Sequence, residues 1–198
     1  MYSEVVNTRE SLIESTRALL WERGYVATSP KAIQQRAGAG QGSMYHHFTG
    51  KEDLAAAAIG RTAELLRAAA DDQLSTTGTA YERIAGYLRR EREVLRGCPI
   101  GRLTQDPDVM DTPALRAPVE QTFAWLRERI AVVVREGVAR GELDRALDPD
   151  ATATTIVAVL QGAYVLARAD AATERFDDAI GGILGLLATH SVTENERH

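Results

Sequence analysis

ATSPKAIQQRAGAGQGSMYHHFTGKEDL, residues 27–54, holds two short helix-forming segments on either side of a glycine-rich turn. Ser29 is a preferred helix N-cap, and Pro30 suits the first helical position because the N–H that it lacks would have no partner there. Gly38 is expected to end this helix, which leaves residues 41–47 for a second one. Two short helices joined by a tight turn predict a helix-turn-helix.

The second of these helices carries side chains of two kinds. We expect Met44 and Phe48 to pack inward. Their partners on the first helix would be Ile33 and Ala37. The polar residues are then free to project outward: Gln41, Ser43, Tyr45 and His46. Amide, hydroxyl and imidazole groups presented in this way are suited to hydrogen bonds with base edges.

The rest of the chain predicts further helices and no strand. Apolar residues recur at three- and four-residue spacing almost everywhere, and no run alternates apolar and polar residues over the length of a strand. A first helix from Asn7 to Arg23 fits a capping box, because Glu10 stands three residues after Asn7, and Gly24 is expected to end it. Its inward side would carry Leu12, Ser15, Leu19 and Leu20. The N-terminal domain would therefore contain three helices.

A long helix is expected after the helix-turn-helix, since Thr49 and Glu52 have the spacing of a second capping box. Gly60 weakens this helix locally, either as an allowance for close packing or as a bend. The next helix would end at Gly97 and carry one stripe of Tyr81, Ile84, Leu88 and Leu95. Prolines allow only short helical pieces between residues 97 and 118.

Three wide apolar stripes predict the remaining helices. The first stripe lies between Phe123 and Val138. Asp148 and Pro149 open the second helix as N-cap and first residue. The last two helices form a hairpin with more apolar surface than one small domain needs, either to close the core of one protomer or to build a four-helix interface with a second copy. The whole chain is predicted to be all-α, with about nine or ten helices.

Composition bounds the class of protein. The chain has 198 residues, of which 44% are hydrophobic, enough to bury a core. Cys98 is the sole cysteine, so no intramolecular disulfide can form, and a reducing compartment is the simplest setting. The N-terminus lacks the pattern of a signal peptide, and no window approaches ~18 uninterrupted apolar residues. We therefore expect a cytoplasmic protein with no membrane partner.

The net charge of −5 first argues against a nucleic-acid partner, because phosphate binding relies on Lys and Arg. The charge is unevenly distributed. Residues 1–51 carry six Lys and Arg against four Glu, a surplus of two positive charges, which leaves −7 for the remainder. The basic end coincides with the helix-turn-helix, although solvated helix faces would explain the same asymmetry.

The helix-turn-helix resembles the TetR family of transcriptional regulators. The residues that carry the resemblance lie at the spacing of the family signature: Ser29, Ile33, Ala37, Gly38, Gly42, Met44, Tyr45, His47, Phe48, Lys51, Glu52 and Leu54. The match covers about fifty residues. Two positions depart from the pattern, since Ala39 replaces the usual Val and Gly40 replaces the usual Ser that caps the recognition helix. Gly is still an acceptable N-cap, so a modest loss of stability is expected.

The resemblance implies that residues 1–50 bind double-stranded operator DNA. It implies that Gln41, Gly42, Ser43, Tyr45 and His46 face the major groove. Tyr45, His47 and Lys51 are then the expected phosphate contacts, and Ser29, at another helix start, could act in the same way. The absence of a side chain at Gly42 would permit close approach of the backbone to DNA. Taken singly, each residue is better explained without DNA: Tyr45 as a core residue and the others as plain surface.

The resemblance further implies that residues 51–198 bind a small, mostly apolar effector and form a homodimer. The chain would then be a repressor whose operator affinity falls when the effector moves the helix that begins at Lys51. Side chains expected on the helices around the effector cavity are Leu66, Tyr87, Cys98, Leu103, Met110, Phe123, Trp125, Leu126, Gln161 and Tyr164. Side chains expected at the dimer interface are Ile156, Leu160, Tyr164, Phe176, Ile180, Ile183, Leu184 and Leu187.

GCPIG, residues 97–101, resembles a segment found in one branch of the same family. Arg96 and Arg102 flank Cys98 in sequence. A sensing thiol requires exposure and nearby positive charge, whereas a buried cysteine would be inert, and the sequence leaves both interpretations open.

Other function classes fit less well. No catalytic spacing of acid, base and nucleophile is present, so we expect no enzyme. A pure protein-interaction module would account for the apolar hairpin but not for the helix-turn-helix. GAGQGS, residues 38–43, lacks the strand and the Gly-Lys-Ser/Thr ending of a nucleotide loop. His46 and His47 point about 100° apart on a helix, which disfavours a metal site. We expect no cofactor and no metal.

Overall fold

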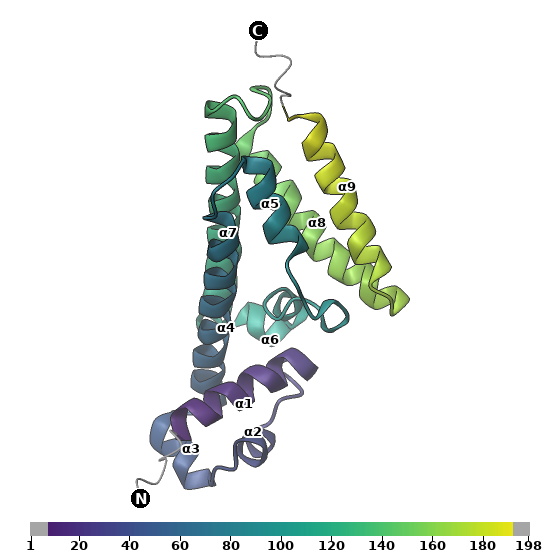
Figure 1. The fold of residues 1–198 in the computed structure, drawn as a ribbon. Helices are drawn as coiled ribbons and strands as arrows, with labels where there is room; N and C mark the ends of the chain where they lie inside the picture. Colours follow the sequence, from purple (N-terminus) through teal and green to yellow (C-terminus); the bar gives the residue numbers. More distant parts are fainter. Residues whose placement is uncertain (1–7, 192–198) are drawn as a thin grey trace, which may run out of the picture. The chain divides into compact units, whose positions relative to one another are not determined.

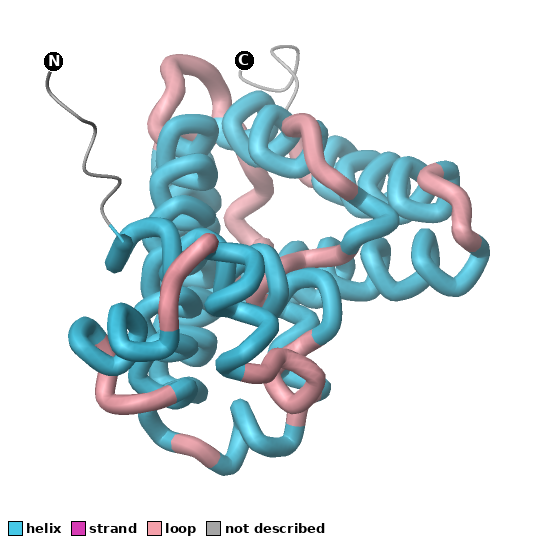
Figure 2. Tube along the Cα trace, turned by 90° about the horizontal axis from the view of Figure 1, so that it is seen from below, coloured by secondary structure: helices cyan, strands magenta, loops and turns pink. Residues whose placement is uncertain are grey.

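The computed structural model describes residues 8–191, which form nine α-helices and two short 3₁₀ helices (Figure 1). Within this range the regular elements are all helical, as predicted, and helices and loops alone appear in the trace (Figure 2). In chain order they are α1 (Thr8–Arg23), α2 (Pro30–Ala37), α3 (Gln41–His47), α4 (Lys51–Leu74), α5 (Ala80–Arg89), η1 (Val94–Arg96), η2 (Gly101–Gln105), α6 (Pro107–Asp111), α7 (Pro113–Ala139), α8 (Pro149–Asp170) and α9 (Glu174–Thr189).

The chain packs into two compact units. The first unit comprises residues 1–65 and 99–122, and the second comprises residues 66–98 and 123–198. Both α4 and α7 contribute residues to each unit. The first unit holds the helix-turn-helix. The expected division at residue 50 concerns function, which packing does not test, so it stays a prediction.

The first unit is built around the side chains that the sequence placed inward. Leu12, Leu19, Ile33, Met44 and Leu54 are almost completely buried. Ser15 and Leu20 of α1 are also buried, as predicted. Asn7, the predicted cap of α1, lies outside the described residues.

The second unit has its core between α5, α7, α8 and α9, with Leu74, Ile84, Leu88, Ile130 and Ile156 among its buried residues. Arg83 is also buried there. Its Nε donates to the carbonyl of Leu74 over 2.8 Å, and its guanidinium contacts Glu136 over 2.5 Å. This hydrogen bond and ion pair connect the end of α4 with α5 and α7.

The start of α5 is held by side chains and by close backbone packing. Thr79 and Glu82 form a capping box at this helix. The N–H of Ala80 donates to Glu142 over 2.8 Å. A Cβ added at Gly137 would lie 2.5 Å from the Cβ of Ala80, so α7 passes α5 at a position where only glycine fits.

Three local predictions were wrong. The helix after residue 80 ends at Arg89, not at Gly97, because the guanidinium of Arg92 donates to the last carbonyls of α5 and takes the place of a further turn; Leu95 is 47% exposed. Prolines were expected to allow only short helical pieces up to residue 118, but the long helix α7 begins at Pro113 and contains Pro118. The carboxylate that bonds to the N–H of Thr49, at the start of α4, belongs to Asp53, one residue after the predicted Glu52.

Candidate nucleic-acid interface

Helix α2 begins and ends as its sequence predicts. The side chain of Ser29 accepts a hydrogen bond from the N–H of Ala32 over 3.2 Å, and Pro30 is the first helical residue. Gly38 adopts the left-handed conformation (φ +64°) and its N–H bonds to carbonyls of the last turn. Ser11 of α1 donates to the carbonyl of Ala37 over 3.1 Å. These contacts fix the direction in which the chain enters the turn before α3.

Helix α3 is anchored by its apolar side. Met44 is fully buried and Phe48 is 4% exposed, so both pack inward as predicted. Ile33 is also fully buried, and the side chain of Gln34 contacts the sulfur of Met44 at 3.5 Å. Gly40 is the N-cap and supplies no side-chain bond. The position of α3 therefore depends on burial of its apolar side more than on capping.

The other side of α3 is open to solvent. Tyr45 is 51% exposed, an unusual setting for so large an aromatic side chain. Gln41, Gly42, His46 and His47 are also exposed, and Ser43 is half-buried. A Cβ added at Gly42 would meet nothing within 4 Å, so the packing of this protomer does not require glycine there. The arrangement presents polar groups and a bare stretch of backbone on one side of a fixed short helix.

Lys51, at the start of α4, contacts an aromatic ring that sequence reasoning missed. Its Nζ lies 3.8 Å from the centre of the Tyr25 ring. Burial lowers the pKa of Lys51, and the negative charges of Asp106 and Asp108 oppose this shift. Burial also raises the pKa of Tyr25, with smaller contributions from Glu52 and the same two aspartates. The Lys51 ammonium thus lies against the Tyr25 ring, and nearby acidic groups favour its charged form.

The segment around η2 contacts the loop that precedes α2. Asp106 accepts hydrogen bonds from the N–H groups of Tyr25 and Val26, and Arg102 donates to the carbonyl of Trp21. Both partners of these contacts belong to the first unit. Sequence reasoning missed them because they join residues about 80 positions apart, and no local pattern marks them.

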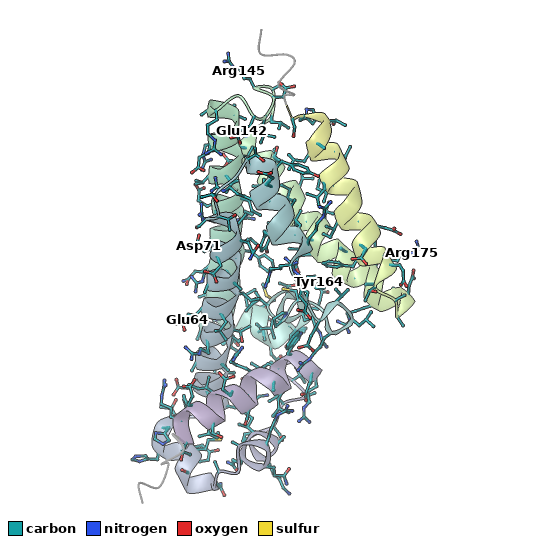
Figure 3. The ribbon with its side chains drawn as sticks, in the orientation of Figure 1. Glu64, Asp71, Glu142, Arg145, Tyr164 and Arg175 are labelled. Atoms are coloured by element: carbon teal, nitrogen blue, oxygen red, sulfur yellow. The ribbon has the colours of Figure 1, made fainter. Side chains whose placement is uncertain are left out.

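The predicted effector residues are divided between the two units. Leu103 and Met110 belong to the first unit, and the other eight belong to the second. Tyr87, Leu126 and Tyr164 are buried core residues of the second unit. Tyr164 is labelled in Figure 3. The remaining five are half-buried: Leu66, Cys98, Phe123, Trp125 and Gln161.

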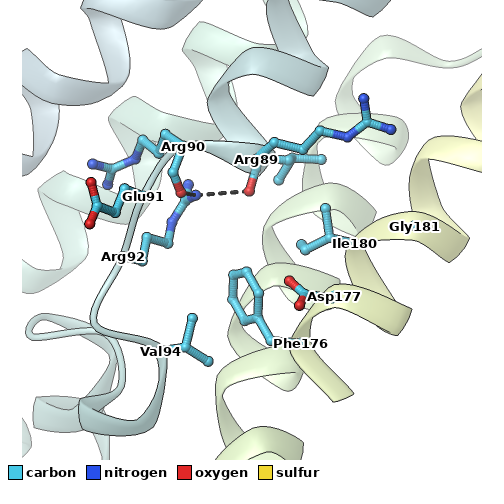
Figure 4. A pocket seen from close by; sticks show the side chains of 10 residues that line it. Arg89, Arg90, Glu91, Arg92, Val94, Phe176, Asp177, Ile180 and Gly181 are labelled. Atoms are coloured by element: carbon cyan, nitrogen blue, oxygen red, sulfur yellow. Dashed lines mark hydrogen bonds between the residues drawn. The ribbon is translucent and has the colours of Figure 1, made fainter. Parts of the chain in front are cut away.

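A cavity of about 440 Å³ in the second unit is lined by none of the ten residues predicted to bind the effector. It lies between the end of α5, the following segment and α9 (Figure 4). Its lining includes Arg90, Arg92, Val94, Phe176 and Ile180. The signal that could have indicated it is the charged run RRER, residues 89–92, directly after an apolar helix.

The predicted dimer residues lie mostly in the interior of their own protomer. Seven of the eight are at most 8% exposed, because α8 and α9 pack against each other and against α5; they are Ile156, Leu160, Tyr164, Phe176, Ile180, Leu184 and Leu187. Ile183 is half-buried. The part of these eight side chains in an interface with a second copy stays a prediction. Large apolar side chains that are exposed on the same helices are Val165, Leu166 and Leu186, at 67%, 53% and 66%.

No group of three or more His, Cys, Asp and Glu side chains suited to a metal ion occurs among residues 8–191. His46 and His47 make an edge contact, with ring centres 4.9 Å apart.

An exposed polar recognition helix, anchored by a buried apolar side and preceded by a capped α2, defines the class of helix-turn-helix DNA-binding proteins. Two family models match the chain. One, described as bacterial regulatory proteins of the tetR family, covers residues 12–58, and the other, described as the tetracyclin repressor-like C-terminal domain, covers residues 78–183. The protein belongs to the TetR family of DNA-binding transcriptional regulators, and it is not an enzyme.

Individual relatives agree with this assignment. The transcriptional regulator AcuR of Cereibacter sphaeroides is 30% identical over 195 residues, which cover 94% of this chain and 86% of that protein. An HTH-type regulator of Lactococcus lactis is 27% identical over 81% of this chain and 83% of its own length. Among solved structures, a TetR regulator of Chloroflexus aurantiacus superposes with a TM-score of 0.84 and 29% identity, covering 93% of this chain and 96% of that one. The reduced form of Escherichia coli NemR has a TM-score of 0.79 at 21% identity, which shows the shared fold alone.

Proposed function

We propose that the protein is a homodimeric repressor that binds a near-palindromic operator and is released from it by a small molecule. Residues 1–50 would bind the DNA and residues 51–198 would bind the effector and form the dimer. The observation that carries the proposal is the exposed polar side of α3, where Tyr45 projects from a helix whose opposite side is buried. A repressor role is further supported by relatives described as repressors, including DhaR of Mycobacterium, which is 27% identical over 85% of this chain.

The proposed DNA contacts are those that the resemblance implied. Gln41, Ser43 and His46 would face base edges in the major groove, and Gly42 would allow the backbone of α3 to approach them. Ser29, Tyr45, His47 and Lys51 would contact phosphates and set the register. For Ser29, the contact would add to its role as N-cap, since its oxygen already accepts from Ala32.

Dimerisation is proposed through the exposed sides of α8 and α9. Val165 and Leu186 are each about two-thirds exposed, and they lie on helices whose other sides are buried in the protomer. Small residues that surround them would let a second pair of helices approach closely: Ala158, Gly162, Ala169, Gly182 and Gly185. Two copies related by a twofold axis would then form a four-helix interface and set two recognition helices at least ~34 Å apart.

We assign the protein to the cytoplasm. Within residues 8–191, α8 is long and apolar enough to span a membrane by length and composition alone. Seven of its side chains are buried in the core of the second unit, and one such helix is weak evidence for a membrane span. We further propose that GCPIG, residues 97–101, marks a branch of the family. Cys98 within it is half-buried, and we propose that it has no sensing role.

The test of the proposed function is titration of the purified full-length protein against DNA from its own promoter region at several salt concentrations. A dimeric repressor that neutralises several phosphates should lose about 10³-fold or more in affinity between 50 and 200 mM salt. Binding that is absent, or that is independent of salt, would remove the proposal. Scrambled DNA of the same length is the control, because its binding reports only the contacts that are independent of sequence.

A further inference from the structure

The turn between α1 and α2 fixes the backbone of Tyr25. Gly24 follows the last residue of α1 and adopts the left-handed conformation (φ +78°). Thr28 is fully buried; its hydroxyl donates to the carbonyl of Gly24 over 2.7 Å, and its N–H donates to the carbonyl of Tyr25 over 3.0 Å. The turn is therefore closed by its own hydrogen bonds, which leave the backbone of Tyr25 little freedom to rotate.

Asp106 binds the same turn from the segment between η2 and α6. Its Oδ2 accepts from the N–H groups of Tyr25 and Val26. A Cβ added at Gly24 would lie 3.2 Å from this oxygen, so the carboxylate approaches the turn where a residue without a side chain leaves room. All of these residues belong to the first unit. Contacts between distant parts of the sequence thus fix the place from which the Tyr25 side chain projects.

The Tyr25 ring makes a close contact with the ammonium group of Lys51. The Nζ atom lies 3.8 Å from the ring centre, whereas the other cation–ring contacts among residues 8–191 involve arginines at 5.1 to 5.6 Å. A cation over the face of an aromatic ring is attracted by the negative potential of that face. The charges of Asp106 and Asp108 also favour charged Lys51, because they oppose the lowering of its pKa by burial.

The other side of the Lys51 ammonium is not used by the protein. Lys51 is half-buried, and it forms no ion pair with a carboxylate of residues 8–191. Other cations of the first unit have such partners, for example Arg36 with Glu22 and Arg61 with Glu10. The ring covers one side of the ammonium group. Its remaining N–H groups are therefore open to an acceptor outside the protomer.

A lysine side chain is flexible, and ordering it opposes binding whenever it contacts a phosphate. Contact with the Tyr25 ring restricts the side chain before DNA arrives. We propose that Tyr25 is a positioning residue for DNA binding, whose ring, fixed through the backbone by Asp106, orients Lys51 toward a phosphate. This inference rests on the proposed phosphate contact of Lys51 and adds two residues that act through it.

The orientation of Lys51 can be measured without DNA, because Lys31 and Lys51 are the only lysines of the chain. Protein labelled with ¹³C-lysine gives separate ε-methylene signals for each, and Lys51→Ala identifies them. Protons above the face of an aromatic ring are shielded, so the Lys51 signal should lie upfield of the signal of exposed Lys31. Tyr25→Leu should abolish the difference, and Asp106→Ala should reduce it. Equal signals in the parent protein, or a Lys51 signal that either substitution leaves in place, overturn the proposal.

A double-mutant cycle tests whether Tyr25 acts on DNA binding through Lys51. Tyr25→Leu should weaken binding of the full-length protein to operator and to unrelated DNA by similar factors of about twofold to tenfold, the range expected for ordering one side chain. The same substitution should have no further effect in Lys51→Ala. Tyr25→Phe keeps the ring and should restore the affinity. A loss that persists in Lys51→Ala would make the role of Tyr25 structural, and tighter binding of Tyr25→Leu would show that the ring withholds Lys51 from DNA; either result overturns the proposal.

Tyr81→Leu is the matched control for loss of a half-buried tyrosine. Tyr81 belongs to the second unit, and no cation of residues 8–191 lies over its ring. Its substitution should leave DNA affinity unchanged, and a loss as large as that of Tyr25→Leu would overturn the proposal. Failure of this inference alone would appear as normal operator binding by the parent protein and a cycle without coupling. Failure of the proposed function would appear as absent operator binding by the parent protein, whatever the lysine signals show.

Discussion

The Oδ2 atom of Asp106 lies 2.8 Å from the backbone nitrogen of Tyr25, a residue 81 positions earlier in the chain. The same oxygen accepts from the N–H of Val26 over 3.2 Å. Residues 25 and 26 lie in the loop that leads to Ser29, the cap of α2. One carboxylate from the segment between η2 and α6 therefore fixes the entry to the helix-turn-helix.

Asp106→Ala should destabilise the protein by about 1–3 kcal/mol, because two backbone donors lose a charged acceptor. It should also weaken operator binding, since the loop that orients α2 is released. Urea unfolding and DNA titration measure the two effects. Asp111→Ala removes an exposed carboxylate of the helix that follows, and it serves as the control. Full operator affinity in a destabilised Asp106→Ala protein would show that the contact serves folding alone.

Gly42→Ala should change folding and DNA binding in opposite directions. Folding should gain up to about 1 kcal/mol, because alanine is the better helix former and nothing lies within 4 Å of the added Cβ. Operator affinity should fall about tenfold or more if the backbone of α3 approaches the groove at this position. Gly60→Ala is the matched control in α4, because a Cβ added there also meets nothing within 4 Å. The same observation argues against the interpretation of Gly60 as an allowance for close packing. Equal operator affinity of the two variants would contradict the proposed approach.

Lys51→Ala should weaken binding to operator and to unrelated DNA by similar factors and reduce the salt slope by about one. The physical reason is loss of a phosphate contact that carries no sequence information. Lys51→Arg should keep the slope, because it keeps the charge. A selective loss of operator binding with an unchanged slope would assign Lys51 to base recognition.

The ion pair of Arg83 with Glu136 predicts a stability that depends on pH. The guanidinium holds the pKa of Glu136 below its ordinary value of 4.5, so the stabilisation is complete above that value and is lost as the pH falls through the folded-state pKa. Glu136→Gln should cost about 1–3 kcal/mol at pH 7. The cost should be much smaller at a pH below the folded-state pKa of Glu136, where its carboxyl is protonated and the ion pair is lost. Urea unfolding at several pH values measures this difference. Glu128→Gln, which removes an exposed pair with Arg135, should cost less than about 1 kcal/mol.

Leu186→Glu should convert the dimer into monomers and abolish high-affinity operator binding, because each half-site would then be bound singly. Analytical ultracentrifugation measures the mass. Leu95→Glu places the same charge on an exposed leucine outside α8 and α9, and it should leave the dimer intact. A Leu186→Glu protein that stays dimeric would place the interface elsewhere.

Local signals predicted the helix-turn-helix well. Ser29, Pro30 and Gly38 act within a few residues of their own position, and Met44 and Phe48 have nearby partners, so spacing alone indicates their roles. The contact of Asp106 with Tyr25 leaves no such trace, because its two partners meet only after the chain has folded. The early end of α5 has a similar cause. The side chain of Arg92 binds the carbonyls of Tyr87 and Leu88, which the N–H groups of a further helical turn would otherwise bind.

The apolar stripes of α8 and α9 show a different limit of sequence reasoning. Periodicity indicates which residues share one side of a helix, but not which surface covers that side. Ile156 and Leu184 were predicted to meet a second copy, and the structure buries both within the protomer. Val165 and Leu186 lie on the same two helices but are exposed to solvent.

The connection from α4 to α5 is fixed at both ends. The carbonyl of Leu74 is bound by Arg83, and Ala80 is held by Glu142 and by its contact with α7 at Gly137. Residues 75–79 join these two anchored points and are exposed. The cost of lengthening a loop rises only slowly with its length, so this connection is a natural place to insert a fluorescent reporter without disturbing either helix.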